Sequence, residues 1–322
     1  MSTEQESDPD MEWNRLEIPG VSPAVVMLME HAIDFAGLFP PAKQSLPAAI
    51  ETYAAARAHR DAWMLERFVL KAADLELFEE AAKNHLPRSE QDEPWPLSVL
   101  VRHDDEGLAE DVQALERFNE AHSDPAEGYA IADVVEIKGE SPASIEAAIN
   151  QMPDEVFPFF ELDWRSDIRG SLATIVGGDA GAKLRTGGLN AEDFPTLEAA
   201  AKFILDAASA EVPLKGTAGM HWPIRADSDV VDGAIAHGFM NFFTAAAVAY
   251  LRDCDESDLI PILSAAADDF EFTGNLIRVD DWELEDFEIA EARQRFVISW
   301  GCCSFDDPRA GLRKLGLMPE EK

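Results

Sequence analysis

Hydrophobic and polar residues alternate in blocks along the chain. Short segments rich in valine, isoleucine, leucine and phenylalanine are separated by longer segments rich in alanine and glutamate. This alternation is typical of strands and helices in a parallel α/β protein. Eight strands are predicted, at Ile33–Gly37, Trp63–Leu70, Pro96–His103, Asp133–Gly139, Val156–Trp164, Ala182–Gly188, Val212–His221 and Arg295–Phe305.

The segments between these strands have the periodicity of amphipathic helices. In Gly107–Asn119, apolar residues recur every three to four positions and form one stripe, at Leu108, Val112, Leu115 and Phe118. Similar helices are predicted at Leu46–Ala58, Ala72–Lys83, Ala143–Gln151, Leu197–Ala208 and Asp232–Leu251. The segment Cys254–Asp286 does not fit one repeat, so we expect an insertion there, with a helix at Ser257–Ala267.

Eight strands with intervening helices in 322 residues favour a (β/α)8 TIM barrel. We expect one domain over residues 11–322, with the insertion before the last strand, and a disordered acidic leader at residues 1–10. No Gly-x-Gly-x-x-Gly follows the first strand, and no strand ends in a Walker-type loop. These absences argue against a nucleotide-binding Rossmann fold, and we expect no cofactor.

Acidic residues dominate the charge of the chain. Asp and Glu number 63 against 26 Lys and Arg, which gives a formal net charge of -37. Such a surface repels phosphate backbones and anionic lipids, so neither nucleic acid nor a membrane is an expected partner. This composition has two explanations: the protein is adapted to high salt, or it is an ordinary acidic cytosolic protein.

The cysteines and the N-terminal residues indicate the cellular compartment of the protein. Cys254, Cys302 and Cys303 have no zinc-site spacing, and an odd number of cysteines argues against a disulfide framework. The acidic N-terminus has no signal-peptide pattern, and no apolar run reaches about 18 residues. We therefore expect a cytoplasmic protein without a membrane partner. A homo-oligomer is compatible with the sequence.

Two predicted strands carry a lysine and then break into glycine. Because barrel chemistry takes place at the carboxyl ends of the strands, these lysines are the first candidates for a site. Side chains two positions apart share a face of a strand. The residues on these faces are Lys183 and Arg185 on the sixth strand, and Lys215, Thr217, Gly219 and His221 on the seventh.

Neighbouring lysines support two interpretations. A lysine is a nucleophile only as the neutral amine, and a second cation nearby lowers its pKa, so Lys183 could form a Schiff base with Lys215 as its partner. Alternatively, Lys183, Arg185 and Lys215 neutralise carboxylates such as Glu161 and Asp163, or bind an anion. Spacing alone favours the second interpretation.

Four short motifs resemble those of deoxyribose-phosphate aldolases and related class I aldolases. They are Lys183-x-x-Thr186-Gly187, Lys215-x-Thr217-x-Gly219, Gly301-Cys302-Cys303-Ser304 and Ala132-Asp133-Val134-Val135. The resemblance implies that Lys183 forms the Schiff base and that Lys215 tunes it. It also implies that the turn at Ser304 binds phosphate and that Asp133 joins a proton relay.

The chain departs from the aldolase motifs at Arg185, Ala218 and His221, and at the insertion before the last strand. As a whole it resembles an uncharacterised family of bacterial (β/α)8-barrel proteins. The residues that carry this resemblance are Asp34-Phe35-Ala36-Gly37-Leu38-Phe39-Pro40-Pro41, the Lys-x-Arg-x-Gly-Gly strand and Cys303-Ser304-Phe305-Asp306. This family supports the fold and implies no particular activity.

Several other residues have open roles. Asp34 could face the barrel mouth as an acid or base, or could anchor a loop. Glu161 and Asp163 share a strand face and could hold a metal, although ion pairing with Lys183 and Arg185 is the simpler explanation. His221 closes the seventh strand and is the best histidine candidate, with a structural role as the alternative.

In the fourth strand, the candidate residues cannot all point into the barrel, because alternate residues face opposite sides. An inward Asp133 would turn Glu136 and Lys138 outward, unless a bulge intervenes. The position of Glu136 and Lys138 near the carboxyl end favours that pair, whereas the aldolase resemblance favours Asp133.

Together these features predict an aldolase-like lyase acting on a small anionic or phosphorylated carbonyl compound. The predicted catalytic residues are Lys183, Lys215, Asp133 and Glu161, and no metal ligand is predicted. Predicted substrate-binding residues are Asp34, Arg185, Thr186, Gly187, Thr217, Gly219, His221 and Ser304. The alternatives are a metal-dependent lyase or isomerase and a non-catalytic barrel that binds an anionic metabolite.

Overall fold

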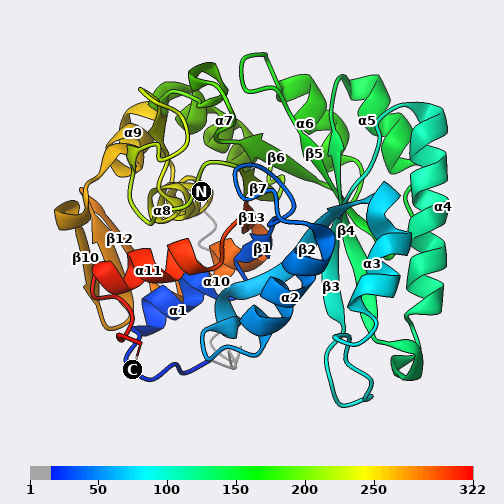
Figure 1. Ribbon diagram of the computed structural model, residues 1–322. Helices are drawn as coiled ribbons and strands as arrows, with labels where there is room; N and C mark the ends of the chain where they lie inside the picture. Colours follow the sequence, from blue (N-terminus) through cyan, green and yellow to red (C-terminus); the bar gives the residue numbers. More distant parts are fainter. Residues whose placement is uncertain (1–15, 322) are drawn as a thin grey trace.

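The eight predicted strands form a closed parallel barrel in the computed structural model, which describes residues 16–321. The predicted leader at residues 1–10 lies outside this range. The barrel strands are β1 (Ile33–Phe35), β2 (Leu65–Lys71), β3 (Trp95–Leu100), β4 (Ala130–Lys138), β5 (Phe157–Glu161), β6 (Gly181–Arg185), β7 (Leu214–Thr217) and β13 (Val297–Cys302). They close in the order β1-β13-β7-β6-β5-β4-β3-β2, which confirms the (β/α)8 TIM barrel (Figure 1).

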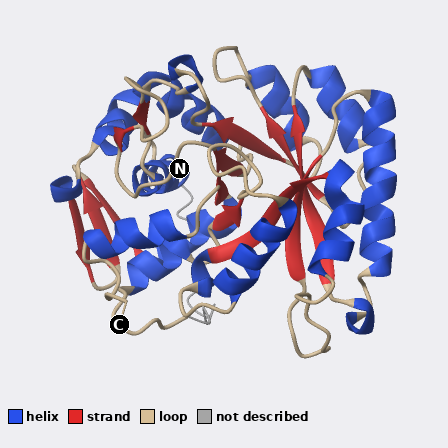
Figure 2. Ribbon diagram, viewed as in Figure 1, coloured by secondary structure: helices blue, strands red, loops and turns tan. Residues whose placement is uncertain are grey.

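Helices surround this barrel (Figure 2). The α-helices are α1 (Pro23–Met29), α2 (Leu46–Arg57), α3 (Leu75–Ala82), α4 (Asp105–Ala121), α5 (Pro142–Ile149), α6 (Arg169–Val176), α7 (Leu197–Ser209), α8 (Phe239–Leu251), α9 (Glu256–Ser264), α10 (Asp286–Arg295) and α11 (Asp306–Lys314). Short 3-10 helices are η1 (Ala62–Met64), η2 (Ala72–Asp74), η3 (Pro125–Glu127), η4 (Ala191–Asp193) and η5 (Ala267–Asp269). No helix of the described part of the chain is long and apolar enough to cross a membrane.

Several of the helices begin at side chains that cap free backbone N–H groups. Asp104 precedes α4, and its carboxylate accepts a hydrogen bond of 2.8 Å from the N–H of Gly107. Thr196 precedes α7, and its hydroxyl oxygen accepts a hydrogen bond of 3.2 Å from the N–H of Ala199. The apolar stripe predicted on α4 is buried at all four positions, Leu108, Val112, Leu115 and Phe118.

The segment before the last barrel strand is more elaborate than its sequence pattern predicts. The expected helix is present as α9, but it is followed by an antiparallel sheet of β10 (Phe270–Thr273), β11 (Leu276–Val279) and β12 (Trp282–Glu285). A two-stranded ribbon of β8 (Ala226–Asp227) and β9 (Ile235–Ala236) lies in the loop after β7. The helix predicted from Asp232 is therefore wrong at its start, because α8 begins at Phe239.

The barrel wall near β13 is packed with aromatic side chains. Trp300 is fully buried, and its ring stacks on Phe239 of α8 at a centroid distance of 4.8 Å and packs edge-on against Phe243 at 5.4 Å. Its indole N–H donates a hydrogen bond of 3.0 Å to the carbonyl oxygen of Met220. Trp300 thus connects the apolar helix α8, the barrel and the loop after β7.

Replacing this side chain should destabilise the whole barrel. We expect Trp300→Ala to lower the free energy of unfolding by about 3–5 kcal/mol, because it opens a cavity and leaves a carbonyl unpaired. Denaturant unfolding followed by circular dichroism measures this loss. Trp164→Ala is the matched control, since Trp164 is partly exposed and contacts the guanidinium of Arg165 at 4.1 Å. Equal losses in the two variants would contradict the prediction.

Candidate active site

A cavity of about 200 Å³ lies at the carboxyl ends of the barrel strands. Its wall includes Pro40 and Pro41 from the loop after β1 and Asp229 and Val230 from the loop after β7. Charged and polar side chains from the strands also line it, namely Glu136, Glu161, Lys183, Arg185 and Thr217. Because TIM barrels bind substrates at this end, the cavity is the candidate active site.

Lys183 of β6 lies at the floor of the cavity between two carboxylates. Its Nζ is 2.8 Å from Glu136 Oε2 and 2.8 Å from Glu161 Oε2. The side chains of Lys183 and Glu136 are 5% and 4% exposed, whereas that of Glu161 is 27% exposed. Lys183 is therefore an ion-paired amine with one deeply buried partner and one partner that solvent reaches.

Lys215 of β7 lies beneath the cavity and does not line it. Its Nζ is 2.6 Å from Glu136 Oε1 and 2.5 Å from Asp34 Oδ2. Two serine hydroxyls complete this layer: that of Ser299 donates to Asp34 at 2.7 Å, and that of Ser98 donates to Glu136 at 2.7 Å. The two lysines therefore share Glu136, one on each carboxylate oxygen.

The pairing of the strands explains why these groups meet. Lys183 is in register with Lys215 on one side and with Glu161 on the other, and Ser299 is in register with Lys215. Side chains of paired residues in parallel strands point to the same face of the sheet, which here is the barrel interior. Arg185, two residues further along β6, lies 3.7 Å from Glu161 and is 47% exposed.

The electrostatic environment keeps Lys183, Glu136 and Glu161 charged. Burial alone would lower the pKa of Lys183, but the attraction and hydrogen bonds of Glu136 and Glu161 outweigh burial and raise that pKa. Burial would raise the pKa of Glu136, but Lys183 and Lys215 hold the pKa far below its usual range. The expectation that neighbouring cations lower the pKa of Lys183 is therefore wrong, because two carboxylates contact its amine.

The structure separates Asp133 from this cluster. The register between β3 and β4 shifts at Asp133, which indicates a bulge, and Glu136 then faces the barrel interior. Arg67 of β2 binds Asp133 through two hydrogen bonds, of 2.9 Å from Nε and 2.6 Å from Nη2. Lys138 is 63% exposed and pairs with Glu140. The carboxylate of β4 that contacts the lysines is thus Glu136 and not Asp133.

Of the predicted substrate-binding glycines and threonines, two line the cavity and two pack between strands. Thr217 and Gly219 line the cavity, whereas Thr186 and Gly187 are not among its lining residues. The hydroxyl of Thr186 donates to the carbonyl oxygens of Thr217 and Ala218, which ties the end of β6 to the end of β7. A Cβ at Gly187 would lie 2.9 Å from the Cα of Gly219, so this pair permits close approach of two chain segments.

His221 follows β7 and Ser304 follows β13, and only His221 of the two lines the cavity. His221 lines the cavity, and its Nδ1 is 3.0 Å from Asp307 Oδ2. The hydroxyl oxygen of Ser304 accepts a hydrogen bond of 3.1 Å from the N–H of Asp307 at the start of α11, and Ser304 is not among the cavity-lining residues. In this arrangement Ser304 supports the helix start.

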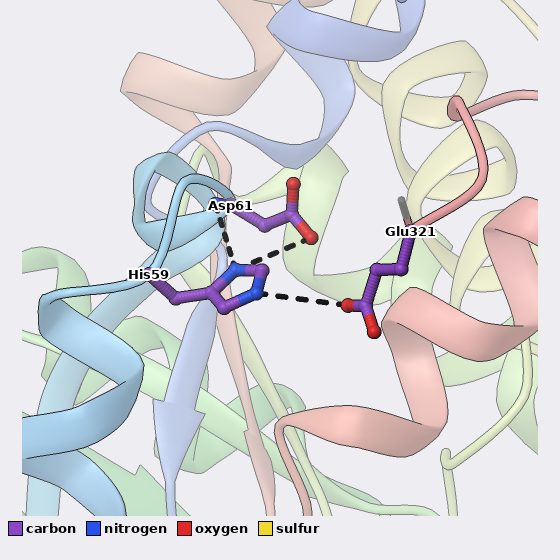
Figure 3. Close-up of side chains that lie close together, drawn as sticks. All are labelled: His59, Asp61 and Glu321. Carbon is purple, nitrogen blue, oxygen red and sulfur yellow. Dashed lines mark hydrogen bonds and ion pairs between the residues drawn. The ribbon is translucent and has the colours of Figure 1, made fainter.

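Glu161 and Asp163 do not form a joint metal site. Glu161 binds Lys183, whereas Asp163 is 59% exposed and contacts Arg165. Within residues 16–321, one group of side chains has ligand atoms close enough for a metal ion: His59, Asp61 and Glu321 (Figure 3). Arginine side chains already bind all three of these residues. We therefore assign this group to an ion-pair network that holds the C-terminus.

Fold and site together define a (β/α)8-barrel protein with a buried cluster of lysines and carboxylates beneath its cavity. No protein-family model matches the chain, and no curated protein matches it significantly.

Three members of the cluster, Glu136, Ser98 and Ser299, were not among the predicted site residues. Glu136 was recognisable only by its position near the carboxyl end of its strand, and the bulge that turns it inward has no clear sequence signal. Ser98 lies in a strand that carried no other candidate, and its contact with Lys215 at 3.3 Å joins residues 117 positions apart.

Removing the central carboxylate should destabilise the barrel in a pH-dependent way. We expect Glu136→Gln to lower the free energy of unfolding at pH 7 by about 3–5 kcal/mol, because two buried lysines lose a charged partner. The pKa of Glu136 is lowered in the folded state, so its contribution is complete above about pH 4.3 and is lost as the pH falls toward the folded-state value.

Denaturant unfolding at pH 7 and at successively lower pH measures this difference. The gap between wild type and variant should narrow below about pH 4. Glu140→Gln is the control, since Glu140 is exposed and pairs only with surface groups. A gap that stays constant down to acid-induced unfolding would show that the charge of Glu136 does not stabilise the fold.

Proposed function

We propose that the protein is an aldolase-type lyase in which Lys183 forms an imine with a small carbonyl compound that carries an anionic group. One observation carries this proposal. The amine of Lys183 faces a cavity, and carboxylates from β4 and β5 can exchange protons with it at 2.8 Å. An amine with adjacent proton acceptors at the carboxyl end of a barrel is suited to imine chemistry.

Because Lys183 is protonated before substrate binds, the first step must remove a proton from its amine. Glu161, the more exposed carboxylate, takes a proton from Lys183 when the substrate displaces water from the cavity. The neutral Nζ then adds to the carbonyl carbon, and the carbonyl oxygen leaves as water after it receives one proton from Nζ and one from the carboxylic acid of Glu161. The product is a protonated imine whose positive charge takes the place of the ammonium charge beside Glu136.

Carbon–carbon cleavage then uses the imine as the acceptor of electrons. A carboxylate removes the proton of the β-hydroxyl group, the adjacent carbon–carbon bond breaks, and its electron pair forms an enamine with the imine carbon. Glu136 lies on the side of Lys183 opposite solvent and is held anionic by Lys215, so it stabilises the iminium charge. Arg185, whose partly exposed side chain lines the cavity, is suited to bind the anionic group of the substrate.

A non-catalytic barrel that binds an anionic metabolite is the second candidate. The observation that favours it is the complete pairing of Lys183 with carboxylates, which is the arrangement expected of a lysine that serves only to balance charge. Metal-dependent catalysis through Glu161 and Asp163 has less support, because those two side chains contact different cations.

Reductive trapping tests the imine. Incubation with short aldehydes and with sugar phosphates, followed by borohydride, should add the mass of the reduced carbonyl compound to Lys183. Lys183→Arg should abolish the adduct, and Lys202→Arg should retain it, because Lys202 is a surface lysine that pairs with Asp206. No adduct at Lys183 with any of these compounds would overturn the proposal. Thermal stabilisation by the same anions without an adduct, retained in Lys183→Arg, would favour the binding function.

The pH profile of trapping tests the proton acceptors. Glu161 is one of the two carboxylates that raise the pKa of Lys183, so Glu161→Gln should increase the fraction of neutral amine at a given pH. We expect the rise in trapping rate, measured with cyanoborohydride and glycolaldehyde, to move to lower pH in this variant. Asp163→Asn is the control, since Asp163 contacts Arg165. A profile that moves to higher pH would contradict the assigned role of Glu161.

A further inference from the structure

A second group of reactive side chains lies on the wall of the same cavity. Cys303 Sγ is 3.5 Å from His221 Nε2, and His221 Nδ1 is 3.0 Å from Asp307 Oδ2. Both Cys303 and His221 line the cavity. A thiol, an imidazole and a carboxylate in this order have the connectivity of a nucleophile, its base and the group that orients the base.

Three separate segments bring these residues together. Cys303 directly follows β13, His221 follows β7, and Asp307 lies in the first turn of α11. The hydrogen bond from the N–H of Asp307 to the hydroxyl oxygen of Ser304 fixes the turn between Cys303 and α11. Ahead of His221, Ala218 and Gly219 have φ values of 61° and 81°, and this reversal of the chain directs the imidazole toward the loop after β13.

Asp307 orients the imidazole for this chemistry. With one ring nitrogen held by the carboxylate, the other faces the sulfur in both protonation states, either accepting the thiol proton or donating to the thiolate. The hydrogen bond with Asp307 and the contact with Cys303 raise the pKa of His221 to about 10. His221 is therefore an imidazolium near neutral pH, and its Nε2 faces the sulfur of Cys303.

We propose that Cys303 is a covalent nucleophile for the acyl group of a small ester or thioester, with His221 as acid and base and Asp307 as a positioning residue. The site is distinct from Lys183 in chemistry and does not depend on imine formation. The cavity, of about 200 Å³, restricts the acyl donor to a small molecule.

The reaction needs no redox partner. The thiolate of Cys303 attacks the acyl carbon, and the bond from that carbon to the leaving alcohol or thiol breaks as His221 donates its proton to the leaving group. The acyl group is then a thioester on Cys303. Water attacks this thioester, His221 removes a proton from the water, the carbon–sulfur bond breaks, and the acid and the free thiol are released.

The other two cysteines provide an internal comparison. Cys254 is partly exposed, and burial together with nearby aspartates raises the pKa of its thiol to about 11. Cys302 is buried, and its burial raises the pKa of its thiol far above the usual range. Accessibility alone would therefore make Cys254 the most reactive cysteine, whereas the contact with His221 favours Cys303.

Alkylation with iodoacetamide, followed by peptide mass spectrometry, separates these alternatives. We expect Cys303 to be labelled before Cys254 at pH 7, and Cys302 last. His221→Gln should slow labelling of Cys303 by about a hundredfold, while labelling of Cys254 is unchanged. Labelling of Cys254 first, or no effect of His221→Gln in a variant with native circular dichroism, would overturn the proposal.

Acylation tests the substrate class. p-Nitrophenyl acetate should release a burst of about one nitrophenolate per protein molecule and leave an acetyl group on Cys303, which is separate in mass and position from an imine adduct on Lys183. Asp307→Asn should slow the burst, and Asp307→Glu should restore part of the rate. Asp306→Asn is the matched control, because Asp306 binds Arg309 rather than His221. Absence of acetyl-Cys303, or an equal effect of the two asparagine variants, would refute the acyl chemistry.

Discussion

A single buried carboxylate organises the interior of this barrel. Glu136 accepts contacts from Lys183 and Lys215, one on each oxygen, and a hydrogen bond from Ser98. An unpaired charge in such surroundings would cost many kcal/mol, so the carboxylate requires the lysines, and Glu161 and Asp34 complete the pairing of Lys183 and Lys215. The contacts join β3, β4, β6 and β7, and Asp34 extends them to β1. Charge compensation therefore constrains the strand register in addition to apolar packing.

The same compensation sets the chemical state of the candidate active site. A neutral lysine is needed for imine formation, yet the carboxylates around Lys183 raise its pKa. The amine can become neutral only if its proton moves to a neighbour, and Glu161, with 27% of its side chain exposed, is the neighbour that an arriving ligand can influence. Burial of the substrate and loss of water would favour this transfer, because desolvation disfavours the charged forms of both groups. The reactivity of Lys183 therefore depends on whether the bound ligand excludes water from the cavity.

Local patterns in the sequence predict the barrel well and the site only in part. The eight strands are recognisable because each is a short apolar block beside an amphipathic helix, and adjacent strands explain why Lys183 meets Lys215. The bulge at Asp133 reverses the expected parity of β4, and bulges depend on the neighbouring strand. The sheet of β10 to β12 and the contact between His221 and Cys303 likewise depend on distant pairs. Periodicity does not encode such contacts.

The two reactive groups differ in their relation to solvent and charge. Lys183 lies at the cavity floor, where carboxylates hold its proton, whereas Cys303 lies on the wall beside an imidazole that can hold the proton of the thiol. An amine with a raised pKa is protonated near neutral pH, whereas the sulfur of Cys303 lies beside an imidazolium, the kind of neighbour that activates cysteine nucleophiles. An electrophilic carbonyl compound that enters the cavity near neutral pH should therefore react first at the wall. Reaction at the floor requires the additional transfer of a proton to a carboxylate.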